Sequence, residues 1–327
     1  MAVYTHLGAE DLSALIAHYD VGKLISAKGI AEGVSNSNWL IETRHSSGET
    51  TSFILTMYER RIDLDDLPFF LDLMDHLAAQ GCPVPRTIHD RSGASARDMD
   101  GKKVALIEYL PGVSVDHPTA EQALSVGRAL AQNHLAVADF KQSRFNDMGL
   151  REWEATTDRC GDAALADIHP ELPNILADQL SGFADQWPSG LPTGVVHCDL
   201  FPDNVLMLGD EVSGLIDFYF SASDAFAYDL AVTHAAWSFT DAGARYRAEI
   251  GDALLVGYED VRQLTGGERK ALPTLARGAC IRFITSRAED WITTPPDALV
   301  TRKDPMDFAR RLRFYQQQGE AIFGGAA

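Results

Sequence analysis

Hydrophobic positions are spaced differently in the first third of the chain and in the rest. In the first 110 residues, short apolar runs alternate with polar turns, a pattern typical of antiparallel strands. Strands are predicted at 24–26, 39–42, 53–58, 86–89 and 104–109. Over 64–80, apolar residues recur every three or four positions and stop at Gly81, which predicts a helix with one buried face.

After residue 110 the pattern changes to long helical periodicities. Helices are predicted at 119–137, 224–238, 246–259 and 272–291. A single strand pair, 204–208 and 212–217, is predicted to interrupt them, joined by a turn that contains Gly209. We therefore predict an α+β protein of two lobes, with a hinge at Pro111-Gly112. A small antiparallel-sheet lobe with one helix would span 1–110, and a larger, mostly helical lobe 111–327.

Composition limits the kinds of partner that the chain can have. The chain has 327 residues, 46% of them hydrophobic and 23% charged, and its formal net charge is −19. This composition is typical of globular proteins, and the negative charge argues against nucleic-acid binding. The sequence has no signal-like start and no apolar run of about 18 residues, so we predict a cytoplasmic protein without membrane insertion. Its four cysteines lack paired spacing and are predicted to be reduced thiols.

The sharpest chemical motif is His-x-Asp-Leu-x-x-x-Asn at 197–204, which matches the catalytic-loop pattern of kinases. Phosphoryl transfer needs a group that accepts the hydroxyl proton and oxygen ligands that hold Mg²⁺ against the phosphates. Asp199 is predicted for the first role. Asn204 and Asp217, at the end of the next strand, are predicted for the second, and His197 is predicted to support the loop. In the alternative interpretation, these side chains only satisfy backbone groups of a turn.

Two further segments are predicted to bind nucleotide. The segment 29–38 lies between two predicted strands and is rich in Gly, Ser and Asn, which permit close backbone approach and donate to phosphate oxygens. Phosphate contacts are predicted for Gly33, Ser35, Asn36 and Asn38, although an ordinary hairpin loop has the same composition. Near the hinge, backbone groups of Glu108 and Tyr109 are predicted to pair with adenine, and an ordinary edge strand is the alternative.

Together these motifs resemble the aminoglycoside-phosphotransferase and choline-kinase-like branch of the protein-kinase fold, over most of the chain. Tyr228-Asp229-Leu230-Ala231 resembles a helix start typical of that branch. Within it, the chain is most similar to kinase-like homoserine kinases, at 33–38, 53–59, 66–70, 216–220 and 282–287. The resemblance implies a phosphotransferase that uses ATP and Mg²⁺ to phosphorylate the side-chain hydroxyl of L-homoserine, a step toward threonine. It implies a small-molecule partner. We expect a monomer or a homodimer.

One residue departs from the general kinase pattern. Kinases carry a lysine on the third strand that pairs with the α- and β-phosphates, but the corresponding run 53–56 ends in Thr56. Homoserine kinases of this type resemble the chain in having threonine there. Lys28, Arg60 and Arg61 are possible sources of the positive charge, although surface residues of this kind are more often only solvated.

The implied substrate carries both an ammonium and a carboxylate group. Arginine suits the carboxylate because its planar fork bonds two oxygens, so Arg282 or Arg287 is predicted to bind it, with a surface salt bridge as the alternative. For the ammonium group, Asp199, Asp224 or an aromatic face such as Tyr219 or Trp237 is possible. The predicted substrate residues are thus Asp199, Tyr219, Arg282 and Arg287.

Three competing functions remain open at this point. A choline-, ethanolamine- or aminoglycoside-type kinase would use the same machinery but needs no carboxylate clamp. A nucleotide-binding module without catalysis would explain the missing lysine. A protein kinase is the weakest alternative, because the chain has no Asp-Phe-Gly or Ala-Pro-Glu segment.

Overall fold

The computed structural model describes residues 7–30, 36–59, 63–295 and 302–324. These residues form two compact units. The first contains the described residues up to Gly112 together with Gly214–Tyr219, and the second contains Val113–Ser213 and the described residues from Phe220 onward. The predicted α+β class is confirmed, because the first unit is built on an antiparallel sheet and the second is mostly helical. The assignment of a nucleotide lobe to 1–110 and a catalytic lobe to 111–327 stays a prediction.

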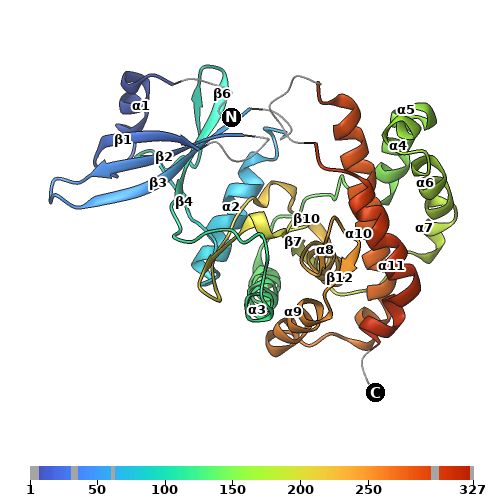
Figure 1. Cartoon of the computed structure of the whole chain (residues 1–327). Helices are drawn as coiled ribbons and strands as arrows, with labels where there is room; N and C mark the ends of the chain where they lie inside the picture. The colour runs from blue at the N-terminus through green and yellow to red at the C-terminus, as the bar shows by residue number, and fades with distance from the viewer. Residues whose placement is uncertain (1–6, 31–35, 60–62, 296–301, 325–327) are drawn as a thin grey trace. The chain divides into compact units, whose positions relative to one another are not determined.

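An antiparallel sheet with flanking helices makes up the first unit (Figure 1). Its helices are α1 (Ala9–Ile16) and α2 (Leu67–Ala79), and its strands are β1 (Lys23–Ile30), β2 (Asn36–Arg44), β3 (Thr50–Tyr58), β4 (Thr87–Ile88), β5 (Arg97–Met99) and β6 (Lys102–Glu108). The strand order is β1-β2-β3-β6-β4, and β5 pairs with β6. Buried side chains of α1, such as Leu12 and Ile16, pack with Trp39, Ile41 and Leu55 of the sheet, which ties this helix to the strands.

Three features of the first unit differ from the prediction. The structure adds α1 and the short polar strand β5, whose sequence Arg-Asp-Met carries no apolar alternation. The strands β1 and β2 also extend into the segment 29–38, which was expected to be a loop. Ile30 pairs there with Asn38, so the backbone ladder outweighs the weak strand preference of Gly, Ser and Asn.

The second unit contains most of the helices. They are α3 (Ala120–Ala136), α4 (Leu150–Cys160), α5 (Asp162–Ile168), α6 (Leu172–Leu180), α7 (Phe183–Gln186), α8 (Phe226–Trp237), α9 (Ala248–Val261), α10 (Gly266–Thr293) and α11 (Met306–Phe323). Its strands form short pairs, β7 (Thr193–Val196) with β10 (Ala222–Ala225), β8 (Val205–Leu208) with β9 (Glu211–Leu215), and β11 (Phe239–Thr240) with β12 (Arg245–Tyr246). None of the described helices combines the length and the apolar composition that a membrane crossing requires.

The predicted strand pair is confirmed as β8 and β9, but the expectation that it is the single pair in this region is wrong, because β7–β10 and β11–β12 also form. The helices α4–α7 and α11 were not expected either. In α4, only Trp153 and Thr156 are buried, so few apolar positions mark this helix in the sequence. Helix α10 begins at Gly266, six residues before the predicted start. A capping box between Thr265 and Glu268 determines this start, with Thr265 Oγ1 accepting from the Glu268 N–H at 3.1 Å.

Candidate active site

The predicted catalytic loop connects β7 to β8 in the second unit, and its polar groups contact one another. The amide nitrogen of Asn204 donates to the backbone carbonyl of Asp199 at 2.8 Å and to its carboxylate Oδ2 at 3.3 Å. The backbone N–H of Asp199 donates to His197 Nδ1 at 3.2 Å. The structure therefore brings three of the predicted residues together. Because Asn204 uses its nitrogen in these bonds, its amide oxygen is the atom suited to a cation.

A buried carboxylate beneath this loop holds its backbone. Asp229, on α8, is fully buried and accepts hydrogen bonds from the N–H groups of His197 at 2.8 Å and Cys198 at 2.7 Å. Burial acts to raise the pKa of Asp229, but its hydrogen bonds with the His134 side chain and the His197 backbone help to outweigh this effect, and the pKa lies below its ordinary value. An ionised Asp229 is the stronger acceptor, so it fixes the start of the catalytic loop.

His134, on α3, extends this network away from the loop. Burial lowers the pKa of His134, so its ring is neutral at pH 7. Its Nε2 lies 3.1 Å from Asp229, which can only accept, so Nε2 carries the proton. Its Nδ1 then accepts from the Tyr258 hydroxyl at 2.7 Å. The loop is thereby connected to α3 and α9 through hydrogen-bonded, buried side chains.

The environment of Asp199 fits a group that accepts a proton. Burial raises the pKa of its carboxyl group above the ordinary value, and Arg282, His197 and Lys303 act against this rise. A carboxylate with a raised pKa is a better base near neutral pH than an exposed one. The arrangement can orient an alcohol hydroxyl and take up its proton.

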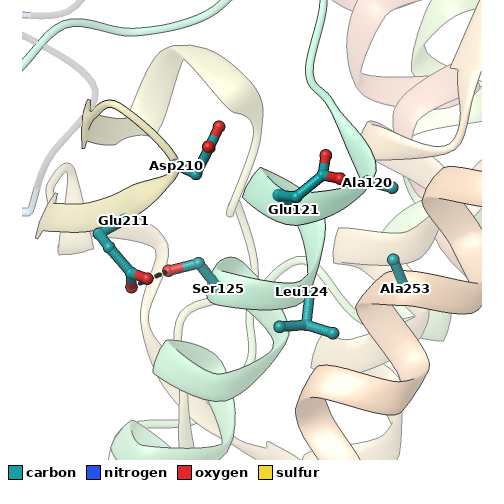
Figure 2. A pocket seen from close by; sticks show the side chains of 7 residues that line it. All are labelled: Ala120, Glu121, Leu124, Ser125, Asp210, Glu211 and Ala253. Atoms are coloured by element: carbon teal, nitrogen blue, oxygen red, sulfur yellow. Dashed lines mark hydrogen bonds between the residues drawn. The ribbon is translucent and has the colours of Figure 1, made fainter.

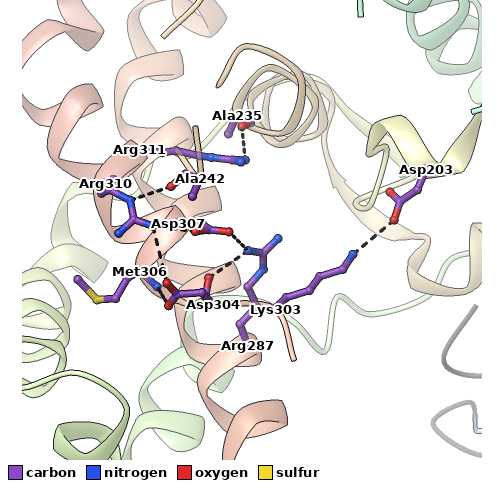
Figure 3. Close-up of polar contacts among 10 residues, drawn as sticks. All are labelled: Asp203, Ala235, Ala242, Arg287, Lys303, Asp304, Met306, Asp307, Arg310 and Arg311. Atoms are coloured by element: carbon purple, nitrogen blue, oxygen red, sulfur yellow. Dashed lines mark hydrogen bonds and ion pairs between the residues drawn. The ribbon is translucent and has the colours of Figure 1, made fainter. Parts of the chain in front are cut away.

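Arg282 and Arg287 both lie on α10 but in different surroundings. Arg282 is only 2% exposed, and its Nη1 donates to the backbone carbonyl of Cys198. Arg287 donates to the Asp304 carbonyl at 3.2 Å and to Asp307 Oδ2 at 3.3 Å (Figure 3). Burial lowers the pKa of Arg287 to about 10, with a further contribution from Arg311. The prediction that one of the two binds a substrate carboxylate remains a prediction.

The segment between α10 and α11 places a lysine beside the catalytic loop. Lys303 Nζ lies 3.4 Å from Asp203 Oδ2, an ion pair drawn in Figure 3, and 5.7 Å from the ring centre of Phe201. Both partners of the ion pair are largely exposed, so it contributes little stability. It does add positive charge near Asp199.

In the first unit, Asp217 and Tyr219 lie next to the sheet. Asp217 adopts a left-handed backbone conformation with φ of 66°, which is uncommon for a residue other than glycine and tends to occur at functional sites. The Tyr219 hydroxyl lies 2.8 Å from the Tyr58 hydroxyl. The Tyr219 ring packs against the ring of Phe70, with 5.8 Å between the ring centres. Burial raises the pKa of Tyr219 well above its ordinary value. The metal role of Asp217 and the substrate role of Tyr219 stay predictions.

The predicted phosphate-binding residues are described only in part. Gly33 and Ser35 lie outside the described residues, as do Arg60 and Arg61. At the start of β2, Asn36 is buried, and Asn38 accepts from Thr56 Oγ1 at 2.8 Å. Thr56, which replaces the third-strand lysine, therefore pairs with a predicted nucleotide residue. Lys28 lies exposed on β1.

Near the predicted hinge, strand β6 ends at Glu108, and Tyr109 follows it. The Glu108 carboxylate accepts from Arg86 Nη2 at 3.0 Å and from its Nε at 3.1 Å, and the Glu108 N–H donates to the Arg86 carbonyl at 2.9 Å. These bonds hold the strand end in place. The Tyr109 side chain is exposed, and adenine binding at this position stays a prediction.

A hollow of about 440 Å³ opens beside α3, α9 and the β8–β9 turn in the second unit (Figure 2). It is lined by Ala120, Glu121, Leu124, Ser125, Asp210, Glu211 and Ala253. Ser125 Oγ donates to Glu211 Oε2 at 3.2 Å across its wall. None of the predicted site residues lines this hollow, so it is distinct from the catalytic loop.

Comparison with known proteins decides the family. Residues 26–264 match the phosphotransferase enzyme family. The chain belongs to this family. It is 47% identical to a homoserine kinase of Xanthobacter autotrophicus over the full length of both chains, and 46% identical to one of Rhizobium etli over 98% of each. The resemblance inferred from the motifs and the prediction of a phosphotransferase are therefore confirmed.

Two solved structures share the fold of this chain. An amicoumacin kinase crystallised with AMP-PNP and Ca²⁺ matches with a TM-score of 0.67 and 14% identity, over 97% of this chain and 94% of that one. A spectinomycin phosphotransferase in complex with ADP and spectinomycin matches with a TM-score of 0.66 and 14% identity, over 98% and 99%. At this identity the likeness supports the kinase-like fold alone.

Sequence reasoning missed the support beneath the catalytic loop. Asp229 was noticed only as part of a family-like helix start, although a carboxylate inside the otherwise apolar stretch 226–237 is a signal for a buried polar contact. The contact of His134 with Asp229 joins residues 95 positions apart, and the bond from Arg282 to Cys198 joins residues 84 positions apart. No local pattern in the sequence reveals either contact.

Proposed function

We propose that the protein is a kinase that transfers the γ-phosphate of ATP to the side-chain hydroxyl of L-homoserine. The observation that carries this proposal is the identity of 47% with a protein named homoserine kinase, over every residue of both chains. The match includes both described units and leaves no segment of the chain without a counterpart. The structure supports it with a catalytic loop of the composition that phosphoryl transfer requires.

In this proposal Asp199 orients the acceptor hydroxyl and takes its proton. The raised pKa of the partly buried Asp199 carboxyl group supports the role. Asn204 holds the carboxylate through its bond to Oδ2, which limits the rotation of the side chain. His197 contributes through the Asp199 backbone N–H and not through proton transfer.

Asn204 and Asp217 are proposed to hold Mg²⁺ against the nucleotide phosphates. Their amide and carboxylate oxygens are hard ligands of the kind that Mg²⁺ prefers, and its remaining positions would be filled by phosphate and water. The bound ion would neutralise phosphate charge during transfer. Asn204 fits this role because its amide nitrogen is already used by Asp199, which leaves the oxygen for the metal.

The nucleotide and the amino acid need further groups. Gly33, Ser35, Asn36 and Asn38 are proposed to contact phosphates, and Glu108 and Tyr109 the adenine. The carboxylate of the amino acid requires a cation, and Arg287 is the arginine whose lowered pKa reflects a buried guanidinium only partly balanced by Asp307. Tyr219 is proposed to contact the substrate. A monomer or homodimer in the cytoplasm remains the expectation from the sequence.

The test is an ADP-release assay on the full chain with ATP, Mg²⁺ and a panel of alcohols. L-homoserine, choline, ethanolamine, L-serine and L-threonine are compared by kcat/KM, and the phosphorylated product is identified by mass spectrometry. We expect L-homoserine to exceed each of the others by about 100-fold or more, because a site built for polar groups rejects substrates that leave those groups unpaired.

Two analogues are matched controls. 3-Amino-1-propanol is homoserine without its carboxylate, and L-2-aminobutyrate is homoserine without its hydroxyl. The first should be a poor substrate and the second should give no product. A preference for choline or ethanolamine would replace the proposal with another small-molecule kinase. Nucleotide binding without turnover of any alcohol would indicate a non-catalytic module.

A further inference from the structure

Cys198, directly before the proposed catalytic aspartate, has an unusual backbone. Its φ is 64°, in the left-handed region that residues other than glycine seldom adopt. Its side chain is buried at 1% exposure, so the residue cannot relax toward solvent. A backbone in this conformation persists only when surrounding contacts hold it.

Both backbone groups of Cys198 are held by charged side chains. Its N–H donates to Asp229 Oδ1 at 2.7 Å, and its carbonyl accepts from Arg282 Nη1. The carbonyl of Cys198 and the N–H of Asp199 belong to one planar peptide group. That N–H donates to His197 Nδ1, so the peptide group is held at one end by Arg282 and at the other by His197. Its orientation sets the direction in which the Asp199 side chain leaves the backbone.

Arg282 is placed to act on the loop. Its guanidinium carbon lies 4.7 Å from the ring centre of Phe283, and its Nε has no hydrogen-bond partner among the described residues. Burial alone would lower the pKa of Arg282, but Tyr228, Cys198 and the carboxylates of Asp199 and Asp229 raise it above its ordinary value. The side chain is therefore a buried cation directed at the catalytic loop.

We propose that Arg282 is a positioning residue that fixes the peptide group between Cys198 and Asp199, and thereby orients the Asp199 carboxylate, instead of binding the substrate. This inference rests on the proposed role of Asp199 in phosphoryl transfer. A substrate clamp would present its guanidinium to an open site, whereas Arg282 directs Nη1 to a backbone carbonyl inside the protein.

The test compares Arg282→Met, Arg282→Gln and Arg282→Lys with a matched control, Arg311→Met. Arg311, on α11, is also buried and also donates to a backbone carbonyl, that of Ala235 at 2.7 Å. We expect Arg282→Met to lower kcat by about 100-fold, because a small misplacement of a catalytic group has an effect of this order. KM for ATP and for L-homoserine should stay within about threefold.

The conservative variants should recover part of the loss. Lysine keeps the charge and glutamine keeps an N–H donor, so each should give a kcat between those of Arg282→Met and the unaltered protein. Arg311→Met should lose stability but keep kcat within about twofold. If Arg282→Met does not fold, Arg282→Lys and Arg282→Gln decide the question by the same comparison of kcat with KM.

A second measurement needs no substrate. Hydrogen exchange followed by mass spectrometry reports on the amides of His197 and Cys198. Their exchange should be at least about tenfold faster in the Arg282 variants, and its rate should not change in Arg311→Met. If the protein phosphorylates another alcohol, the kinetics are measured with that alcohol, so failure of the homoserine proposal leaves this one testable. Unchanged kcat and exchange, or a higher KM for the substrate at unchanged kcat, would overturn the positioning role.

Discussion

At the scale of single residues, Asp199 offers the clearest test of the chemistry. We expect Asp199→Asn to lower kcat by about 1,000-fold, because the amide keeps the shape of the side chain but cannot accept the hydroxyl proton. Stability should not fall. Burial raises the pKa of Asp199, so the folded protein holds the ionised form at a cost at pH 7, and the neutral amide avoids that cost. Steady-state kinetics and thermal unfolding at pH 7 measure the two effects.

Asp203 provides a matched control four positions along the same loop. Its carboxylate is largely exposed and pairs only weakly with Lys303, so Asp203→Asn should keep kcat within a few-fold. A normal kcat in Asp199→Asn would exclude Asp199 as the base. Equal losses in the two variants would mean that charge in the loop matters and that the position of the carboxylate does not.

At the scale of elements, α3 and α9 cross at two glycines. A Cβ atom on Gly257 would lie 2.0 Å from the Leu124 carbonyl oxygen, and one on Gly127 would lie 2.1 Å from that of Leu254. Neither neighbour can yield, because both are helix backbone. We therefore expect Gly257→Ala to lower the free energy of unfolding by about 3 kcal/mol, at the upper end of the effect of overpacking. Urea unfolding at pH 7 measures this change.

Gly266, at the first position of α10, is the control for this substitution. A Cβ atom there meets no neighbour within 4 Å, so Gly266→Ala should leave stability unchanged or raise it by about 0.5 kcal/mol. The crossing also affects the catalytic loop, because α3 carries His134, which bonds Asp229. If Gly257→Ala has the same free energy of unfolding as the unaltered protein, the two helices can move apart without loss of stability.

The same elements show how far a sequence pattern predicts structure. Helix α2 was predicted at 64–80 and spans Leu67–Ala79, because an amphipathic helix that packs on a sheet carries its pattern within itself. The α3–α9 contact has no such pattern, because two distant glycines matter only once the helices meet. Likewise, the motif at 197–204 predicted the loop, but its support depends on Asp229 and Arg282, which come from helices later in the chain.

At the scale of the whole molecule, we expect the buried His234 to lower the stability of the fold in acid. His234, on α8, is fully buried, and burial lowers its pKa from 6.5 to about 3. Its Nδ1 lies 2.6 Å from the Tyr315 hydroxyl, and Tyr246 and Phe323 pack around the ring. The unfolded chain therefore binds a proton between pH 6.5 and 3 that the folded chain does not bind. The contribution of His234 to the free energy of unfolding is therefore complete above pH 6.5, and it is lost as the pH falls from 6.5 toward 3.

At pH 5 this single histidine should have removed about 2 kcal/mol from the free energy of unfolding. His234→Gln should be less stable than the unaltered protein at pH 7, but the difference should shrink toward pH 5, because glutamine does not titrate. Urea unfolding at pH 7, 6 and 5 follows this difference.

His117→Gln, at an exposed position, is the control and should keep the pH dependence of the unaltered protein. If His234→Gln also keeps the pH dependence of the unaltered protein, protonation of the buried His234 ring does not drive the acid unfolding of the molecule.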